Sequence, residues 1–280
     1  MQKVAILLTS YNRREAALSC LRNLYSQADA MKGEEKYDFS VYLVDDGSTD
    51  GTSDDVAEIF PGVKIIRTDG GLYWNQGMRL AWEEASKDEP DFYFWGHVGT
   101  TLHEGALSTL METSEYLRHK AIVVGTCSSM NGALTYGGRQ RKGRLIPPDD
   151  TIPIPCHTFD RNIVLVPRSV YTELGGLEAK YRHNYGDYDY GVRAFKSGIY
   201  RVIAPGVLGI CERRTGIPAW RDSSYHLDER MGFLLSPKGR PPKEQFRYDY
   251  RNRGFFYALW HQISISASVL FPVMKKRRRG

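Results

Sequence analysis

Short apolar runs alternate with segments of helical periodicity along the first 205 residues of this chain. Four of the runs are Val4–Leu8, Val41–Val44, Lys64–Arg67 and Phe92–Trp95. Between the first two, Arg13–Gln27 places its apolar residues at the 3.6-residue spacing of an amphipathic helix. Strands that alternate with helices favour a mostly parallel central sheet with helices on both faces. We therefore predict an α/β fold.

The same alternation continues after residue 102 and then stops. Further strands are predicted at Ala121–Gly125, Asn162–Val166 and Arg201–Ala204, and further helices at Arg168–Leu174 and Tyr188–Lys196. A Pro- and Arg-rich stretch, 139–155, interrupts the pattern and predicts a mobile surface loop. We expect a catalytic domain at 1–205, with a first half at 1–102 and a second half at 103–205, followed by an extension at 206–253 and a tail at 254–280.

The net charge of the chain comes from its last residues. Lys plus Arg is 38 and Asp plus Glu is 33, so 38 − 33 gives +5. Five cations and no acid lie in 275–279, which leaves residues 1–274 balanced. A balanced body argues against a nucleic-acid-binding face spread over the fold. The excess instead indicates a local contact with an anionic surface.

The segment Gly254–Met274 precedes these cations and contains no charged side chain. Its apolar residues recur at spacing three to four, which predicts an amphipathic helix. An apolar helix face followed by a polybasic run is typical of an anchor on an anionic membrane. The alternative is a helix packed on the fold with a solvated basic end.

The cysteines and the N-terminus favour a cytoplasmic protein, peripheral on the inner face of the membrane. Cys20, Cys127, Cys156 and Cys211 lie far apart and form no CxxC pair, so we expect free thiols in a reducing compartment. The first apolar run is too short for a signal peptide and predicts a strand.

Polar loops follow the first three predicted strands. They read Thr9-Ser10-Tyr11-Asn12-Arg13, Asp45-Asp46-Gly47-Ser48-Thr49-Asp50-Gly51-Thr52 and Asp69-Gly70-Gly71-Leu72-Tyr73-Trp74-Asn75-Gln76-Gly77. Carboxylates accept hydrogen bonds from a base or a ribose, and glycines let the backbone approach a ligand closely. Each loop alone also fits turn and helix-cap chemistry. Together they predict a ligand site at the carboxyl ends of the strands.

These loops, in this order, resemble the nucleotide-sugar-binding half of family 2 glycosyltransferases with the GT-A fold. The segment GLYWNQGMRLAW is similar to the donor-side segment of a rhamnosyltransferase-like branch, and Gly175-Gly176-Leu177 followed by 185–193 resembles the acceptor-side motif. The resemblance implies a nucleotide-diphospho-sugar transferase fold. It also implies transfer from a UDP- or dTDP-sugar to a saccharide or lipid-linked acceptor, in cell-surface polysaccharide synthesis.

The resemblance also implies roles for single residues. Thr9, Tyr11, Asn12 and Arg13 would line the nucleotide pocket, and Asp45 or Asp46 would hold the base or ribose. Asp69, Trp74, Asn75 and Gly77 would lie on the diphosphate or sugar side.

Asp187 matches the family's general base, and Asp189 follows two residues later. A helix N-terminus would lower the pKa of such an acid and keep it ionised, ready to take a proton from the acceptor hydroxyl. One base without a second nucleophile favours inversion by single displacement. The alternative is that both acids only cap their helix and pair with Arg193.

The sequence departs from the family where a divalent cation, Mg²⁺ or Mn²⁺, is expected to bind. Val98 and Gly99 stand where carboxylates are expected, and neither supplies a side-chain oxygen. His97 is a weak candidate ligand for a softer metal.

Three explanations remain open. The site is metal-independent, with Arg213, Arg214 or Arg139 neutralising the diphosphate; or it is a sugar-nucleotide-binding pseudoenzyme or membrane scaffold; or segment 96–99 has been altered. A nucleotidyltransferase is a further alternative, but TSYNRR lacks the Gly-rich basic loop that such enzymes carry at the first strand.

Overall fold

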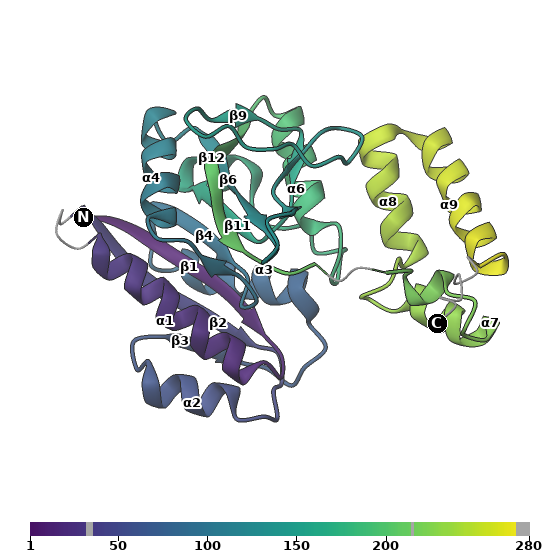
Figure 1. The fold of residues 1–280 in the computed structure, drawn as a ribbon, viewed down its shortest axis with the longest axis horizontal. Helices are drawn as coiled ribbons and strands as arrows, with labels where there is room; N and C mark the ends of the chain where they lie inside the picture. The colour runs from purple at the N-terminus through teal and green to yellow at the C-terminus, as the bar shows by residue number, and fades with distance from the viewer. Residues whose placement is uncertain (32–35, 214–215, 273–280) are drawn as a thin grey trace.

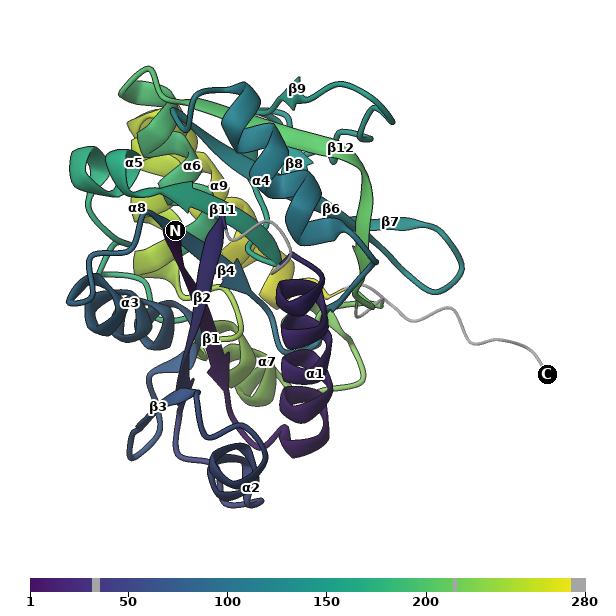
Figure 2. The same ribbon diagram turned by 90° about the vertical axis from the view of Figure 1, so that its left-hand side faces the viewer.

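The computed structural model describes residues 1–31, 36–213 and 216–272. Within these residues the chain folds around a ten-stranded sheet with helices on both faces (Figures 1 and 2). Its strands are β1 (Gln2–Ser10), β2 (Tyr37–Asp45), β3 (Lys64–Arg67), β4 (Phe92–Gly96), β5 (Thr101–Leu102), β6 (Ala121–Ser128), β7 (Leu134–Tyr136), β9 (Ile154–Pro155), β11 (Ile163–Pro167) and β12 (Tyr200–Ile210). The main order is β3-β2-β1-β4-β11-β6-β12-β5.

Strand direction confirms the predicted, mostly parallel sheet and shows a reversal at β11, in its middle. Strands β1 to β4 pair in parallel, as do β6 and β12, but β11 runs antiparallel between β4 and β6. Its first residue, Ile163, pairs with Gly96 at the end of β4. The residues that precede β11 therefore lie at the same edge of the sheet as the carboxyl ends of the parallel strands.

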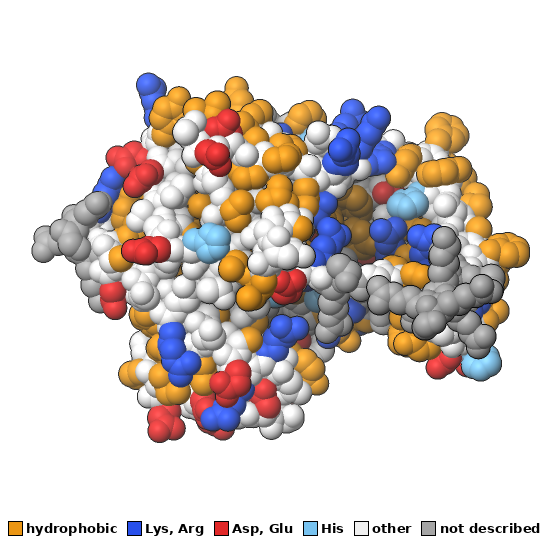
Figure 3. All heavy atoms as spheres, viewed as in Figure 1, with side chains coloured by type: hydrophobic (Ala, Val, Ile, Leu, Met, Phe, Trp, Pro, Cys, Tyr) orange, Lys and Arg blue, Asp and Glu red, His pale blue; other side chains and the backbone are white. Residues whose placement is uncertain are grey.

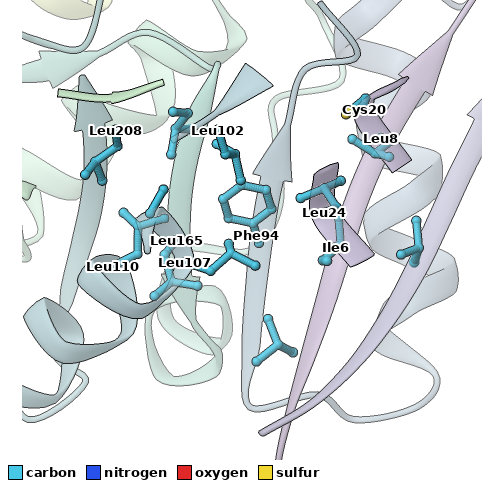
Figure 4. Close-up of a cluster of buried hydrophobic side chains, with 14 of the residues drawn as sticks. Ile6, Leu8, Cys20, Leu24, Phe94, Leu102, Leu107, Leu110, Leu165 and Leu208 are labelled. Carbon is cyan, nitrogen blue, oxygen red and sulfur yellow. The ribbon is translucent and has the colours of Figure 1, made fainter. Parts of the chain in front are cut away.

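Each face of the sheet buries its own apolar cluster under its own helices. Helices α1 (Arg14–Ala30), α2 (Thr52–Ile59) and α4 (Ala106–Tyr116) cover one face, where Leu8, Leu24, Phe94 and Leu107 pack together (Figure 4). Helices α3 (Tyr73–Ser86), α5 (Arg168–Leu174) and α6 (Gly186–Lys196) cover the other, around an aromatic cluster. That cluster includes Trp74, Trp82, Trp95, Phe159 and Tyr190.

Three further helices lie to one side of the sheet (Figure 1). They are α7 (Leu227–Leu235), α8 (Pro242–Arg253) and α9 (Phe255–Leu270), preceded by a short 3-10 turn at Ala219–Arg221. Helix α9 buries Ile265 and Val269 against Trp220 and Leu234.

Helix α9 is the helix predicted in the tail, and it has one packed face and one exposed face. One face packs on its neighbours, while the opposite face leaves Phe256, Trp260 and Ile263 exposed by 86%, 61% and 62%. Hydrophobic side chains line the outer side of α9 in the space-filling view (Figure 3). No helix in the described ranges is long and apolar enough to cross a membrane. The basic run 275–279 lies outside the described residues.

The segment 139–155 differs from the predicted surface loop at both ends. It begins in β8 (Gly138–Arg139), which pairs with β10 (Thr158–Phe159), and it ends in β9, which pairs with β12. All four cysteines are buried and free of disulfides, in agreement with the prediction.

Candidate active site

A pocket of about 740 Å³ opens at the carboxyl edge of the parallel strands. It draws residues from the loops after β1, β2 and β4, from the segment before β11 and from the start of α6. Among the predicted site residues, its lining includes Thr9, Tyr11, Arg13, Asp46, Trp74, His97 and Asp187. The structure thus brings most of the predicted residues together, and their roles in binding and catalysis stay predictions.

Asn12 ties two of the predicted loops together beside the pocket. Its backbone is left-handed, at φ 48°, and its side-chain oxygen accepts a hydrogen bond from the Thr49 amide at 2.7 Å. Its own amide donates to the Ser48 hydroxyl at 2.9 Å. These bonds hold the loop after β1 against the loop after β2. Tyr11 and Arg13, on either side of Asn12, therefore belong to a turn that is fixed in place.

The two neighbouring acids at the end of β2 border different pockets. Asp46 lines the main pocket, and its carboxylate accepts the Leu72 and Tyr73 amides at 2.9 and 2.8 Å. Asp45 borders a second pocket of about 330 Å³ and accepts hydrogen bonds from the Ser48 amide and the Ser53 hydroxyl. Of the two candidates for the base or ribose, Asp46 is therefore the one beside the other predicted donor residues.

Of the predicted residues in the loop after β3 and the start of α3, Trp74 is the one that reaches the main pocket. Asn75 is fully buried and donates to the carbonyls of Glu178 and Tyr181 at 2.9 and 2.7 Å. Gly77 packs so closely that a β-carbon there would lie 2.9 Å from Thr9 Cγ2. Asp69 is exposed and lies outside the lining of both described pockets.

Asp187 is a buried carboxylate on the wall of the pocket. It is 5% exposed, and burial raises its pKa to about 6, with Arg161 opposing and Asp160 adding to the rise. The position at a helix N-terminus predicts a lowered pKa for Asp187. That prediction is wrong in direction, because the loss of hydration raises the pKa more than the helix N-terminus lowers it. A carboxyl of this pKa is still largely ionised at neutral pH, which suits a general base.

Asp189 lies outside the pocket lining and has its charge neutralised. It pairs with Arg193 at 3.1 Å and Arg251 at 2.8 Å, and it accepts the Tyr181 hydroxyl at 3.1 Å. The ion pair with Arg193 is the one expected if Asp189 has only a structural role. The geometry gives no support to a catalytic role for Asp189. Because Arg251 belongs to α8, Asp189 instead fastens the C-terminal helices to α6.

The residues around His97 do not fit Mg²⁺ or Mn²⁺. Burial, Arg161 and Arg13 lower the pKa of His97 to about 4, so its ring is neutral and faces two cations. Val98 is part of the apolar core. In the described part of the chain no group of three or more His, Cys, Asp or Glu side chains could hold a metal ion. A hard cation needs oxygen ligands that this segment lacks.

The remaining carboxylates of the pocket are already engaged. Asp160 accepts hydrogen bonds from the Arg139 guanidinium and the Tyr188 hydroxyl, and Glu212 accepts the Met130 amide. This pairing also corrects the expectation for Arg139, which is buried against Asp160 and is not available to a diphosphate. Arg213 lines the pocket as expected, and Arg214 lies outside the described residues.

Sequence reasoning missed Arg161 and His183, which line the pocket between Trp74 and Asp187. Arg161 lies over the Trp74 ring, 4.4 Å from its centre, and donates to the His183 carbonyl at 3.0 Å. The available signal was the polar triplet 160–162 directly before a strand. It points to the site only once that strand is known to run antiparallel.

Comparison with known proteins gives a family and a fold. The model of the family described as glycosyl transferase family 2 matches residues 5–171. No curated protein sequence matches the chain.

Three solved structures of Staphylococcus aureus TarS are similar, each at 14% sequence identity. The structure of TarS residues 1–349 in complex with UDP-GlcNAc matches at TM-score 0.62, over 96% of this chain and 72% of the TarS chain. The same residues with UDP match at TM-score 0.58, over 95% and 75%. Longer TarS matches at TM-score 0.58, over 91% and 44%. These likenesses confirm the predicted GT-A fold.

Proposed function

This chain belongs to glycosyl transferase family 2, and on that premise we propose that it moves a sugar from a nucleotide diphosphate to a hydroxyl of a saccharide or lipid-linked acceptor. The observation that carries the proposal is Asp187. It is a buried acid with a pKa of about 6, on the wall of a pocket shared with the predicted donor-binding residues. Such a group can accept a proton at neutral pH.

In the proposed reaction Asp187 takes the proton of the acceptor hydroxyl as its oxygen attacks the anomeric carbon. A bond forms between that oxygen and the carbon, the bond from the carbon to the diphosphate breaks, and the nucleoside diphosphate leaves. Inversion of the anomeric carbon follows from one displacement. Support comes from Asp160, another acid of the pocket, whose oxygens accept hydrogen bonds from Arg139 and Tyr188 and so are not free to act as a nucleophile.

For the donor we propose a UDP- or dTDP-sugar carrying a hexosyl or rhamnosyl group. Support comes from the pocket's aromatic side chains, Tyr11, Tyr73 and Trp74, which offer flat apolar surface to a base or a sugar ring. TarS, which shares the fold, is described in complex with UDP-GlcNAc.

We further propose that the protein acts at the inner face of an anionic membrane, in the synthesis of a cell-surface polysaccharide. Support comes from the exposed apolar face of α9, which carries Phe256, Trp260 and Ile263. Aromatic and aliphatic side chains on one helix face are typical of interfacial membrane binding.

Isothermal titration with a panel of UDP-, dTDP- and GDP-sugars, followed by assays of donor hydrolysis and transfer, tests the proposal. We expect one nucleotide class to bind and its sugar to be transferred. Binding without turnover on any acceptor would favour a sugar-nucleotide-binding pseudoenzyme. Absence of binding to every nucleotide sugar would overturn the proposal.

A further inference from the structure

The guanidinium of Arg13 lies next to the position that the family assigns to a metal-ligating acid. A β-carbon built on Gly99 would stand 3.6 Å from Arg13 Nη1. The chain therefore has a cation beside a position where a carboxylate is expected. Arg13 comes from the turn after β1, directly before α1, and the same pocket contains it and the predicted donor residues.

A second guanidinium, that of Arg161, enters the pocket from the segment before β11. Its planar group stacks over Trp74 and donates to the His183 carbonyl, so its orientation is fixed by two contacts. A guanidinium held in a fixed plane can donate two parallel hydrogen bonds to a phosphate.

Neither guanidinium forms an ion pair with a carboxylate within residues 1–31, 36–213 and 216–272. Three of the pocket's acids are turned to other donors: Asp46 to backbone amides, Asp160 to Arg139 and Glu212 to the Met130 amide. The fourth, Asp187, feels the charge of Arg161, which opposes the rise of its pKa, but forms no ion pair with it in the described residues. Unpaired cations in a partly enclosed pocket favour an anionic ligand over another cation.

The two histidines of the pocket are held neutral mainly by burial, and the nearby cations act in the same direction. The pKa of His97 is lowered to about 4 by burial, Arg161 and Arg13, and that of His183 to about 3 by burial, Arg161 and Lys238. Both rings are therefore neutral at pH 7. The positive charge of the pocket therefore comes from its arginines and Lys238 and not from its histidines.

We propose that Arg13 and Arg161 bind the donor's diphosphate and stabilise the departing nucleoside diphosphate in place of a divalent cation. This inference rests on the proposed function. When the anomeric bond breaks, its electron pair passes to the diphosphate oxygen, and the added negative charge is held by the two guanidiniums. No electron or proton is exchanged with the arginines.

The test is titration of UDP and dTDP into the full chain, once with EDTA and once with Mn²⁺. We expect the dissociation constant to be the same in both conditions. Arg13→Gln and Arg161→Gln should each weaken binding about 10- to 100-fold, the usual loss for a hydrogen bond to a charged group. Arg22→Gln, on the exposed side of α1, is the matched control and should leave affinity unchanged.

A third variant, Gly99→Asp, adds a carboxylate beside Arg13 and requires the His97 ring to shift, because its β-carbon would stand 2.8 Å from His97 Cε1. It should weaken binding in EDTA, and Mn²⁺ should restore part of the loss. Circular dichroism checks folding, and Arg13→Gln keeps the test readable if Arg161→Gln unfolds, because Arg13 is exposed.

Each result bears on a different claim. Binding that requires Mn²⁺, or arginine variants that bind as tightly as the control, would overturn the inference while the glycosyltransferase proposal stands. A chain that binds no nucleotide under either condition would overturn both the inference about the arginines and the proposed glycosyltransferase function.

Discussion

The side-chain oxygen of Asn75 lies 1.7 Å from the point where a β-carbon on Gly186 would stand. Asn75 belongs to α3, and Gly186 is the first residue of α6, directly before Asp187. The amide nitrogen of Asn75 holds the carbonyls of Glu178 and Tyr181. A residue at a predicted donor-binding position thus packs against the first residue of the helix that carries the proposed base.

Gly186→Ala should therefore move α6 and reduce both stability and turnover. Its methyl group would overlap a buried side chain, and overpacking of this kind costs about 1–3 kcal/mol. Urea unfolding measures the change. Gly232→Ala is the matched control, since Gly232 lies within α7 with no atom within 4 Å of its added β-carbon, and it should be neutral or stabilising by about 0.5–1 kcal/mol. Equal losses in the two variants would contradict this account.

The rate of transfer should follow the ionisation of Asp187. Because burial raises its pKa to about 6, kcat at saturating donor and acceptor should fall as the pH drops through 6 and level off above 7. Asp187→Asn should keep UDP affinity and lose transfer at every pH. Transfer retained by this variant would show that another group is the base.

Removal of the same charge should stabilise the fold. The pKa of Asp187 is about 6 in the folded chain against 3.8 for a solvent-exposed aspartate, so ionisation opposes folding. This cost is absent below pH 3.8, grows as the pH rises and is complete above about 6. Asp187→Asn should thus raise the free energy of unfolding by on the order of 3 kcal/mol at pH 7.5 and by little at pH 4. A gain that does not depend on pH would argue against a buried charge.

Arg251 should matter more to stability than its neighbour on α8, Arg247. Arg251 pairs with fully buried Asp189 and with Glu178, and Arg251→Gln leaves Asp189 with a single cation. Breaking a buried pair costs about 3–5 kcal/mol, so we expect a loss approaching that range, reduced by the remaining Arg193. Arg247 lies 3.7 Å from Glu178 in a more exposed pair, and Arg247→Gln should cost less than about 1 kcal/mol. Thermal unfolding of both variants provides the comparison.

Membrane binding should depend on the exposed face of α9. Phe256→Ser together with Trp260→Ser should abolish co-sedimentation with vesicles of phosphatidylglycerol and phosphatidylcholine, because these side chains are exposed by 86% and 61%. UDP affinity should not change. Tyr116→Ser, on α4, is the control for loss of an exposed aromatic residue. Equal sedimentation of the α9 variant and the control would place the contact elsewhere.

The sequence predicts the sheet because hydrophobic periodicity depends on neighbours along the chain. It does not predict strand direction, which depends on pairing between distant segments. For this reason the strand at β11 was expected, while its reversal and the resulting place of Arg161 were not. Asp189 and Asn75 show the same limit. Their types and positions match a site motif, but their partners, Arg251 and Glu178, lie 62 and 103 residues away.

The reversal of β11 has a consequence for building chimeric enzymes from this fold. Arg13 enters the pocket from the turn after β1, and Arg161 from the segment before β11, in the second half of the chain. A graft that exchanges only residues 1–102 for those of another transferase would bring in one partner of the pair without the other. A chimera meant to alter donor choice should therefore place its junction after β11, so that both arginines come from the same parent enzyme.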